Sequence, residues 1–239
     1  MEEKVKIGKF EVSVVKKDIK NFHLSVLPPL GKVRVAVPNK TDDEAIRLFI
    51  LSKTPWIKRQ IKKFELQERE SQREFISGES HYFKGQRYIL NIKHHNLAPK
   101  VVIRNKTNID FYIKESLSRD DRENAFYKWY RKELKLILPE IVSKWEKRIG
   151  VKTNEYKVKK MKTKWGTCNH KAKRIWLNLE LIKKPLIHLE YVILHELVHL
   201  IENTHNETFL SHMDNHMSQW RIHKDELNSL SLAYEEWNE

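Results

Sequence analysis

Three histidines and one glutamate stand at fixed spacings in the stretch HELVHLIENTH, residues 195–205. In a helix, His195 and His199 project from one face, so their imidazoles can bind the same metal ion. Glu196 is not needed as a ligand, and its carboxylate could instead take a proton from a water molecule on the metal. His205 follows His199 by six residues, a spacing that lets the helix end and the chain return a third imidazole. The sequence therefore predicts a site for one zinc ion per chain, with a fourth coordination position open to water.

Apolar residues surround this motif. The letters YVIL precede it, and four apolar residues lie inside it: Leu197, Val198, Leu200 and Ile201. A helix of this composition is expected in a protein core, where a dry wall around an ion strengthens the field of the ion. The alternative is a buried helix whose histidines are satisfied by hydrogen bonds alone, but the spacing favours the metal site.

Short strand patterns fill the first half of the chain. Alternating apolar residues predict the strands, and turn residues separate them. The predicted strands lie at residues 10–15, 22–27, 33–37, 81–83, 87–92, 100–104 and 110–113. Two helices interrupt them, one opened by a capping box at residues 41–44 and one begun by Pro55. No internal repeat is evident in the letters.

The second half is predicted to be mainly helical. A long helix follows the cap residue Ser118 and ends at Gly150, and Pro139 is expected to kink or divide it. The other expected elements are strands at residues 156–161 and 174–181 and a helix from Pro185 through His195. Because the strand-rich pattern stops near residue 115, we expect two regions, residues 1–115 and residues 116–239.

Four pieces of the second half, in this order and spacing, resemble the YgjP-like family of zinc metallopeptidases, which are relatives of SprT-like proteins within the zincins. The pieces are MKTKWGTC, RIWLNLELI, YVILHELVHL and NTHNETF, and TDDEAIRLFILSKTPWIKRQIKKF extends the resemblance to the first half. The resemblance implies an α+β fold: a small strand-rich N-terminal region with a helical hairpin, then a zincin-like metallohydrolase domain with an HExxH active-site helix. It implies His195, His199 and His205 as zinc ligands and Glu196 as general base.

The formal charge of +14 predicts attraction to polyanions or acidic partners. Much of it lies in the segment 157–174, KVKKMKTKWGTCNHKAKR, which contains no acidic residue. A single cysteine excludes an intrachain disulfide and fits a reducing compartment. No apolar stretch has the length of a membrane span, and the first residues, MEEKVKIGKF, lack a signal-peptide core. We expect a cytoplasmic protein without membrane association.

Several residues outside the motif are candidates for the site. Substrate could contact members of the basic segment, and an oxyanion could be stabilised by a residue near or after the motif. The candidates in the segment are Lys162, Lys164, Trp165 and Arg174, and those near or after the motif are Arg221, His223, His212, His216 and Tyr191. Cys168 is weighed as a fourth ligand, which would close the coordination shell and make the zinc structural. RIWLNLEL is the candidate for an edge strand beside which a peptide could lie extended.

Three functions follow from these features. The first is hydrolysis of peptide bonds by a metal-activated water, with a peptide or protein as substrate and Glu196 as base. The second keeps the metal but takes a nucleoside triphosphate, because pyrophosphatase action on UTP is also attributed to YgjP-like proteins. The third is a zinc-stabilised module that binds nucleic acid through residues 157–174.

Overall fold

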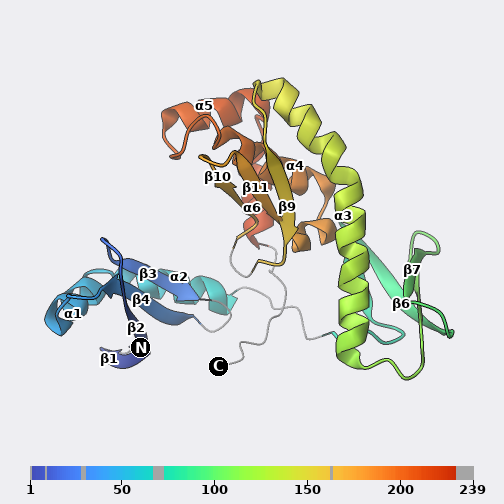
Figure 1. Cartoon of the computed structure of the whole chain (residues 1–239), viewed down its shortest axis with the longest axis horizontal. Helices are drawn as coiled ribbons and strands as arrows, with labels where there is room; N and C mark the ends of the chain where they lie inside the picture. Colours follow the sequence, from blue (N-terminus) through green and yellow to red (C-terminus); the bar gives the residue numbers. More distant parts are fainter. Residues whose placement is uncertain (1, 9, 28–30, 67–72, 162–163, 230–239) are drawn as a thin grey trace. The chain divides into compact units, whose positions relative to one another are not determined.

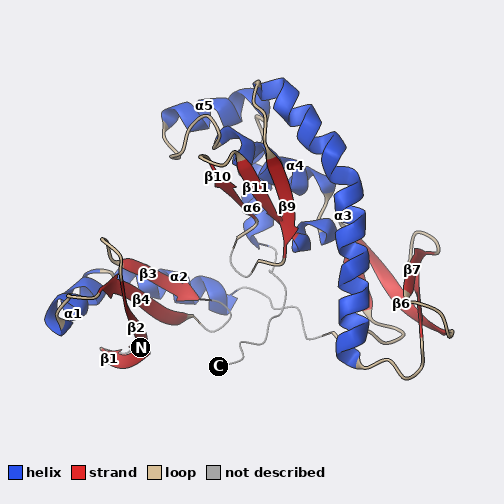
Figure 2. Ribbon diagram, in the orientation of Figure 1, coloured by secondary structure: helices blue, strands red, loops and turns tan. Residues whose placement is uncertain are grey.

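The computed structural model describes residues 2–8, 10–27, 31–66, 73–161 and 164–229 (Figure 1). These residues form strands and helices in mixed order, which confirms the α+β class (Figure 2). The chain divides into two compact units, one within the first 70 residues and one from Ser71 to Ser229. Among the described helices, none is both long and apolar enough to cross a bilayer.

The first unit is a four-stranded sheet with two helices. The strands are β1 (Glu2–Ile7), β2 (Phe10–Lys17), β3 (His23–Leu27) and β4 (Lys32–Pro38), and the helices are α1 (Asp43–Ser52) and α2 (Thr54–Leu66). The sheet order is β1-β2-β4-β3. Asp42, and not Thr41 of the expected capping box, caps α1 by accepting a hydrogen bond from the Ala45 amide. Apolar residues of the sheet and both helices form one core in this unit.

The second unit begins with another four-stranded sheet. Its strands are β5 (Ser80–Phe83), β6 (Gln86–His94), β7 (Lys100–Ile103) and β8 (Asn108–Ile113), in the order β5-β6-β8-β7. In both four-stranded sheets the second and fourth strands are parallel, and the first and third strands pair antiparallel to them. The two sheets therefore share one topology although the sequence shows no repeat.

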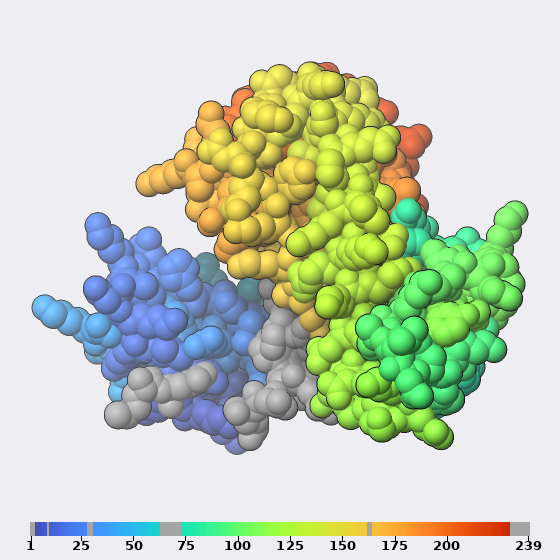
Figure 3. All heavy atoms as spheres, turned by 45° about the vertical axis from the view of Figure 1, so that its right-hand side comes forward, coloured from blue at the N-terminus to red at the C-terminus, as the bar shows by residue number. Residues whose placement is uncertain are grey.

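The long helix α3 (Arg119–Ile149) spans the second unit. Ser118 caps its start and Gly150, at φ 73°, ends it, as the sequence predicts. Pro139 lies inside this helix, and the expectation that it divides the helix is wrong. Figure 3 shows α3 along the surface between the β5–β8 sheet and the rest of the unit. Phe126 of α3 packs edge-on against Phe111 of β8, at 5.3 Å between ring centroids.

The rest of the second unit carries the motif. A three-stranded sheet comprises β9 (Glu155–Lys159), β10 (Gly166–Asn169) and β11 (Arg174–Asn178), in the order β10-β11-β9. A 3-10 turn (Leu179–Lys183) and the helices α4 (Leu186–Val198), α5 (Glu207–His216) and α6 (Trp220–Ser229) follow. One continuous core joins these elements to α3 and to the β5–β8 sheet.

The border between the units differs from the one expected near residue 115. The β5–β8 strands, which the sequence pattern grouped with the N-terminal region, share a core with the motif-bearing helices. The reason is that α3 has apolar residues along its whole length and packs against both sheets of the second unit, β5–β8 and β9–β11. A change from strand to helix pattern is therefore no domain border in this chain.

Candidate metal centre

The geometry of the HELVH motif follows from where α4 ends. His195 and Glu196 lie in its last turn, and His199 is its C-cap residue. The chain then turns, and Asn206 caps the start of α5 by accepting a hydrogen bond from the Phe209 amide. His205 directly precedes that cap. The return of the chain thus brings a third histidine to the end of α4.

The three histidines converge. One ring nitrogen of each of His195, His199 and His205 lies within 4.8 Å of those of the other two. The Nε2 atoms of His195 and His205 are 3.1 Å apart. Two nitrogens bound to one tetrahedral zinc at about 2.0–2.1 Å would lie about 3.3 Å apart. The side chains present therefore fit a zinc ion held by three imidazoles.

The protonation of the rings suits a metal. Burial, together with the neighbouring histidines, lowers the pKa of His195 to about 3, and burial also lowers the pKa of His199. The Nδ1–H of His199 can donate to the carbonyl oxygen of Glu202, 3.0 Å away, which leaves Nε2 of His199 free to bind. Nδ1 of His195 is buried and has no partner among the described residues. Both rings are neutral at neutral pH, as metal ligands must be.

Phe209 of α5 forms the floor under the histidines. Its side chain is buried, and its ring centroid lies 5.0 Å from that of His195 and 4.7 Å from those of His199 and His205. An apolar ring in contact with all three imidazoles limits their rotation and keeps water from one side.

Glu196 lies beside the histidines without joining them. It is buried, and desolvation raises the pKa of its carboxyl to about 8, against an opposing effect of Lys164. The carboxylate packs on Gly166 of β10, where a Cβ would lie 2.6 Å from Oε1 and 2.8 Å from Cγ of Glu196. The glycine makes room for the carboxylate.

A cavity of about 270 Å³ opens over this cluster. Its walls come from the end of α4, from β10 and the turn that follows it, and from the loop before α5. The lining residues are Lys164, Gly166, Thr167, Cys168, His170, His195, Glu196, His199, Asn203 and His205. Lys164, a candidate for substrate binding, is thus among the lining residues, and its role stays a prediction. Cys168 lines the cavity, but its sulfur is not one of the three converging ligand atoms.

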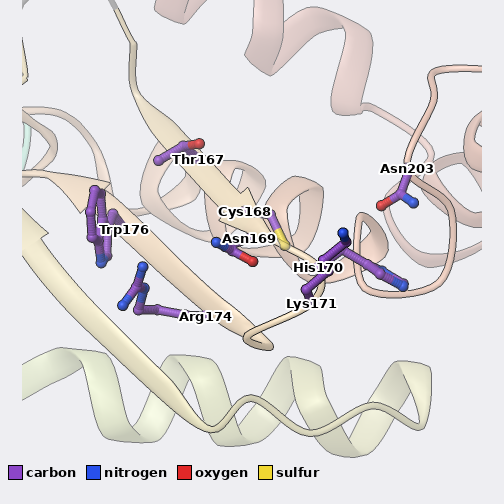
Figure 4. A pocket seen from close by; sticks show the side chains of 8 residues that line it. All are labelled: Thr167, Cys168, Asn169, His170, Lys171, Arg174, Trp176 and Asn203. Atoms are coloured by element: carbon purple, nitrogen blue, oxygen red, sulfur yellow. The ribbon is translucent and has the colours of Figure 1, made fainter.

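A second hollow of about 450 Å³ adjoins the first (Figure 4). The two share Thr167, Cys168, His170 and Asn203. The remaining lining residues of the second hollow are Asn169, Lys171, Arg174 and Trp176. Arg174 lies 4.7 Å from the ring centroid of Trp176, and Lys159 lies 3.2 Å from it. This hollow is lined by cations and an aromatic ring and by no acidic residue.

Other predicted site residues lie elsewhere or outside the described residues. Lys162 falls outside them. Trp165 packs against the core, with the Lys184 ammonium 5.8 Å from its ring centroid, and it does not line the cavity. Arg221 forms an ion pair with Asp214. His223 of α6 lies near Glu226 of the same helix and His188 of α4, and it does not line the cavity either.

The edge strand beside the histidines is β10, and the choice of RIWLNLEL for that role is wrong. β11 (Arg174–Asn178) lies between β10 and β9, so both of its edges are paired. RIWLNLEL is a longer and more apolar run than GTCN, the sequence of β10. Such a run indicates a central strand rather than an edge.

Sequence reasoning missed three residues that shape the site. Asn178 is fully buried, and its side chain donates to the carbonyl oxygens of Met161 and Lys164, 2.8 Å from each. It thereby fixes the backbone at Lys164. The Nδ1–H of His170 can donate to the carbonyl oxygen of His199 at 3.3 Å, which ties the β10–β11 turn to the end of α4. The contact of Gly166 with Glu196 joins residues 30 positions apart and is not visible in the sequence pattern.

A protein family and several solved structures match this chain. The model of a family described as "YgjP-like, metallopeptidase domain" matches residues 20–230. Among solved structures, the chain is similar to the metallopeptidase zymogen abylysin of Pyrococcus abyssi, at 16% identity and a TM-score of 0.36. It is also similar to the zymogen jannalysin of Methanocaldococcus jannaschii, at 26% identity and a TM-score of 0.34. Each likeness covers 38% of this chain and 90% of the other. A search of curated proteins found no match.

Proposed function

This chain belongs to the YgjP-like metallopeptidase family, and we propose that it hydrolyses peptide bonds with one zinc ion held by His195, His199 and His205. The observation that carries the proposal is the convergence of three imidazoles beside a buried carboxylate that is not part of their cluster. A structural zinc site has no use for such a carboxylate, whereas a hydrolytic site needs a base.

Zinc bound there would polarise the scissile carbonyl and lower the pKa of a water molecule to about 7. Glu196 takes the proton of the attacking water and passes it to the leaving amine. Its environment suits both steps, because burial raises the carboxyl pKa whereas Lys164 and a bound zinc ion favour the charged form. A pKa near the working pH lets one group accept and then donate.

The substrate backbone would lie along β10. Its outer edge is unpaired among the described strands, and its residues Gly166, Thr167 and Cys168 line the cavity with Glu196. An extended peptide can add to such an edge through main-chain hydrogen bonds. A peptide bound there would have its scissile bond next to the carboxylate.

A second candidate ligand is a nucleotide or a nucleic acid. The hollow that adjoins the metal cavity is lined by Lys171 and Arg174 and walled by Trp176. Cations beside an aromatic ring suit phosphates and bases. Such a ligand could be the substrate, as in triphosphate hydrolysis, or an anchor beside a peptide substrate.

The deciding experiment screens zinc-loaded protein against denatured proteins and against nucleoside triphosphates, with Glu196→Gln as control. We expect peptide cleavage, reduced by about 10²- to 10⁴-fold in Glu196→Gln, which retains zinc because the side chain is no ligand. His199→Ala should lose the zinc of this site. Triphosphate hydrolysis that needs Glu196, without peptide cleavage, would replace the proposed substrate. Equal turnover in Glu196→Gln and wild type would remove Glu196 from the mechanism.

A further inference from the structure

A second group of potential ligands lies on the same helix as the HELVH motif. His188 of α4 and His223 and Glu226 of α6 each place one ligand atom within 4.8 Å of those of the other two. His223 and Glu226 are three residues apart on α6, so they project from one face of that helix. This group is separate from the three histidines of the candidate metal centre and shares no residue with them.

The distances within the group are those of ligands around one cation. Oε2 of Glu226 lies 3.0 Å from Nε2 of His188 and 3.5 Å from Nδ1 of His223. Two ligands of one tetrahedral zinc would lie about 3.3 Å apart. One carboxylate oxygen therefore faces two imidazole nitrogens at spacings on either side of the expected value.

Hydrogen bonds alone do not satisfy the group. Nε2–H of His188 can donate to Oε2 of Glu226, and the nearest partner of the buried Nδ1 of His223 is that same oxygen, 3.5 Å away. Nδ1 of His188 is buried too and has no partner among the described residues. A cation between the three side chains would accept a lone pair from each of them. A proton in a hydrogen bond links only two of the three.

His188 also resembles a residue with a proposed metal role. It precedes His195 by seven residues, which puts both on one face of α4, two turns apart. Both rings have a buried Nδ1 without a partner among the described residues, and both direct Nε2 to their clusters. His188 is therefore presented from α4 in the way that His195 is.

We propose that His188, His223 and Glu226 form a second metal site, which takes a divalent cation of the zinc type with water as the remaining ligand. Two imidazoles and one carboxylate are a donor set that zinc accepts. The Glu226 side chain is 54% exposed, which gives the ion and its water a path to solvent. The group raises the expected content from one zinc per chain to two.

The role that follows is structural. α6 contacts α4 beside the motif: Trp220 of α6 stacks on Tyr191 of α4 at 6.4 Å, and Tyr191 lies edge-on to His195 at 5.9 Å. A cation shared by His188 and α6 would fasten α6 to this face of α4. It would hold Tyr191 in place next to His195 without touching the substrate cavity.

The test is a zinc count on protein that has been stripped with a chelator, reloaded with three equivalents of zinc and desalted. We expect two zinc ions per chain in wild type and one in either His188→Gln or Glu226→Gln. His199→Ala should also hold one, and the double variant His199→Ala with Glu226→Gln none. His216→Gln, which removes a histidine of α5 outside both groups, is the matched control and should hold two.

The outcomes separate this site from the proposed function. One zinc in wild type and none in His199→Ala would overturn the second site and leave the three-histidine site intact. One zinc in both proteins would overturn the three-histidine site instead. Two ions in Glu226→Gln would remove Glu226 and overturn the assignment. Thermal unfolding gives a second readout: zinc should raise the Tm of His199→Ala but not that of the double variant.

Discussion

Gly166 of β10 packs directly on Glu196 of α4, and no side chain fits between them. A Cβ on this glycine would lie 2.6 Å from Oε1 of Glu196 and 2.8 Å from Cγ1 of Val192. Both values are shorter than any ordinary contact between such atoms. The glycine is therefore required for the position of the proposed base, and its backbone conformation is not the reason, since its φ is not positive.

We predict that Gly166→Ala displaces the Glu196 carboxylate and lowers peptide turnover by about 10²-fold, because a shift of about 1 Å at a reacting group costs that much. Zinc content should stay unchanged, since the atoms nearest to an added Cβ belong to Glu196 and Val192 and not to a proposed ligand. Steady-state kinetics and elemental analysis measure the two effects. If the glycine acts through Glu196, adding Gly166→Ala to Glu196→Gln should cost little more. Additive losses would show another role.

Cys168→Ser tests the alternative of a four-ligand structural site. Burial raises the pKa of the Cys168 thiol to about 11, and the nearby Glu196 contributes. The Cys168 sulfur is also not one of the three converging ligand atoms. We predict full zinc content and near-normal turnover in the serine variant. Loss of zinc from Cys168→Ser would favour the structural reading and count against hydrolysis.

The sequence predicted the grouping of the three histidines better than their surroundings. The spacing of His195 and His199 reflects helix geometry, and His205 follows after one short turn, so the convergence of the rings could be expected. Gly166 and Asn178 were missed because their roles depend on contacts with residues far along the chain. The same holds for the edge position of β10, since pairing between strands is not visible in one strand's letters.

In the fold, too, local features were predicted and long-range ones were not. In the second half, α3, α4, β9 and β11 were predicted from apolar patterns, and the caps Ser118 and Gly150 from their residue types, whereas β10, α5 and α6 were not predicted. The shared topology of the two four-stranded sheets was not predicted. It is a property of strand order and direction, and different apolar sequences can fill the same positions. The border of the units was misplaced because Phe126 of α3 packs back on Phe111 of β8.

Stability of the metal-free protein should depend on pH through Glu196. Its folded pKa is raised to about 8 from 4.5, so the folded state binds more protons between these values and stability falls as pH rises. His195, with its pKa lowered to about 3, acts in the opposite sense but only below its unfolded value of 6.5. Between pH 6.5 and 8 only the glutamate effect of this pair remains.

We predict that chelated wild type loses about 2 kcal/mol of stability relative to Glu196→Gln from pH 6.5 to pH 8, because the window spans about 1.5 pH units. Urea unfolding of both proteins at the two pH values measures the difference. Zinc should reduce the dependence, since a cation beside the carboxylate favours its charged form. The same slope in wild type and Glu196→Gln would place the titration on another group.

Binding of a nucleic acid, the second candidate ligand, can be tested on the basic face of the β9–β11 sheet. Lys157, Arg174 and Trp176 lie on neighbouring positions of β9 and β11, and Lys159 covers the ring of Trp176. If this face binds nucleic acid, affinity should fall steeply with salt, with a slope of about 0.9 in log K per neutralised phosphate of duplex DNA. Lys157→Glu with Lys159→Glu should then abolish binding and leave zinc content intact.

A triphosphate ligand predicts a different pattern. The hollow beside the metal cavity contains Lys171 and Arg174, so Arg174→Gln should raise KM for a nucleotide and leave peptide cleavage nearly unchanged. Lys135→Gln, a change on α3 far along the sequence from either strand, is the charge-matched control and should alter neither. Fluorescence anisotropy with labelled duplex and single strands at low salt measures the binding of nucleic acid. Undetectable binding there, with an unchanged nucleotide KM in Arg174→Gln, would leave this basic face as a solvated surface and the peptidase proposal untouched.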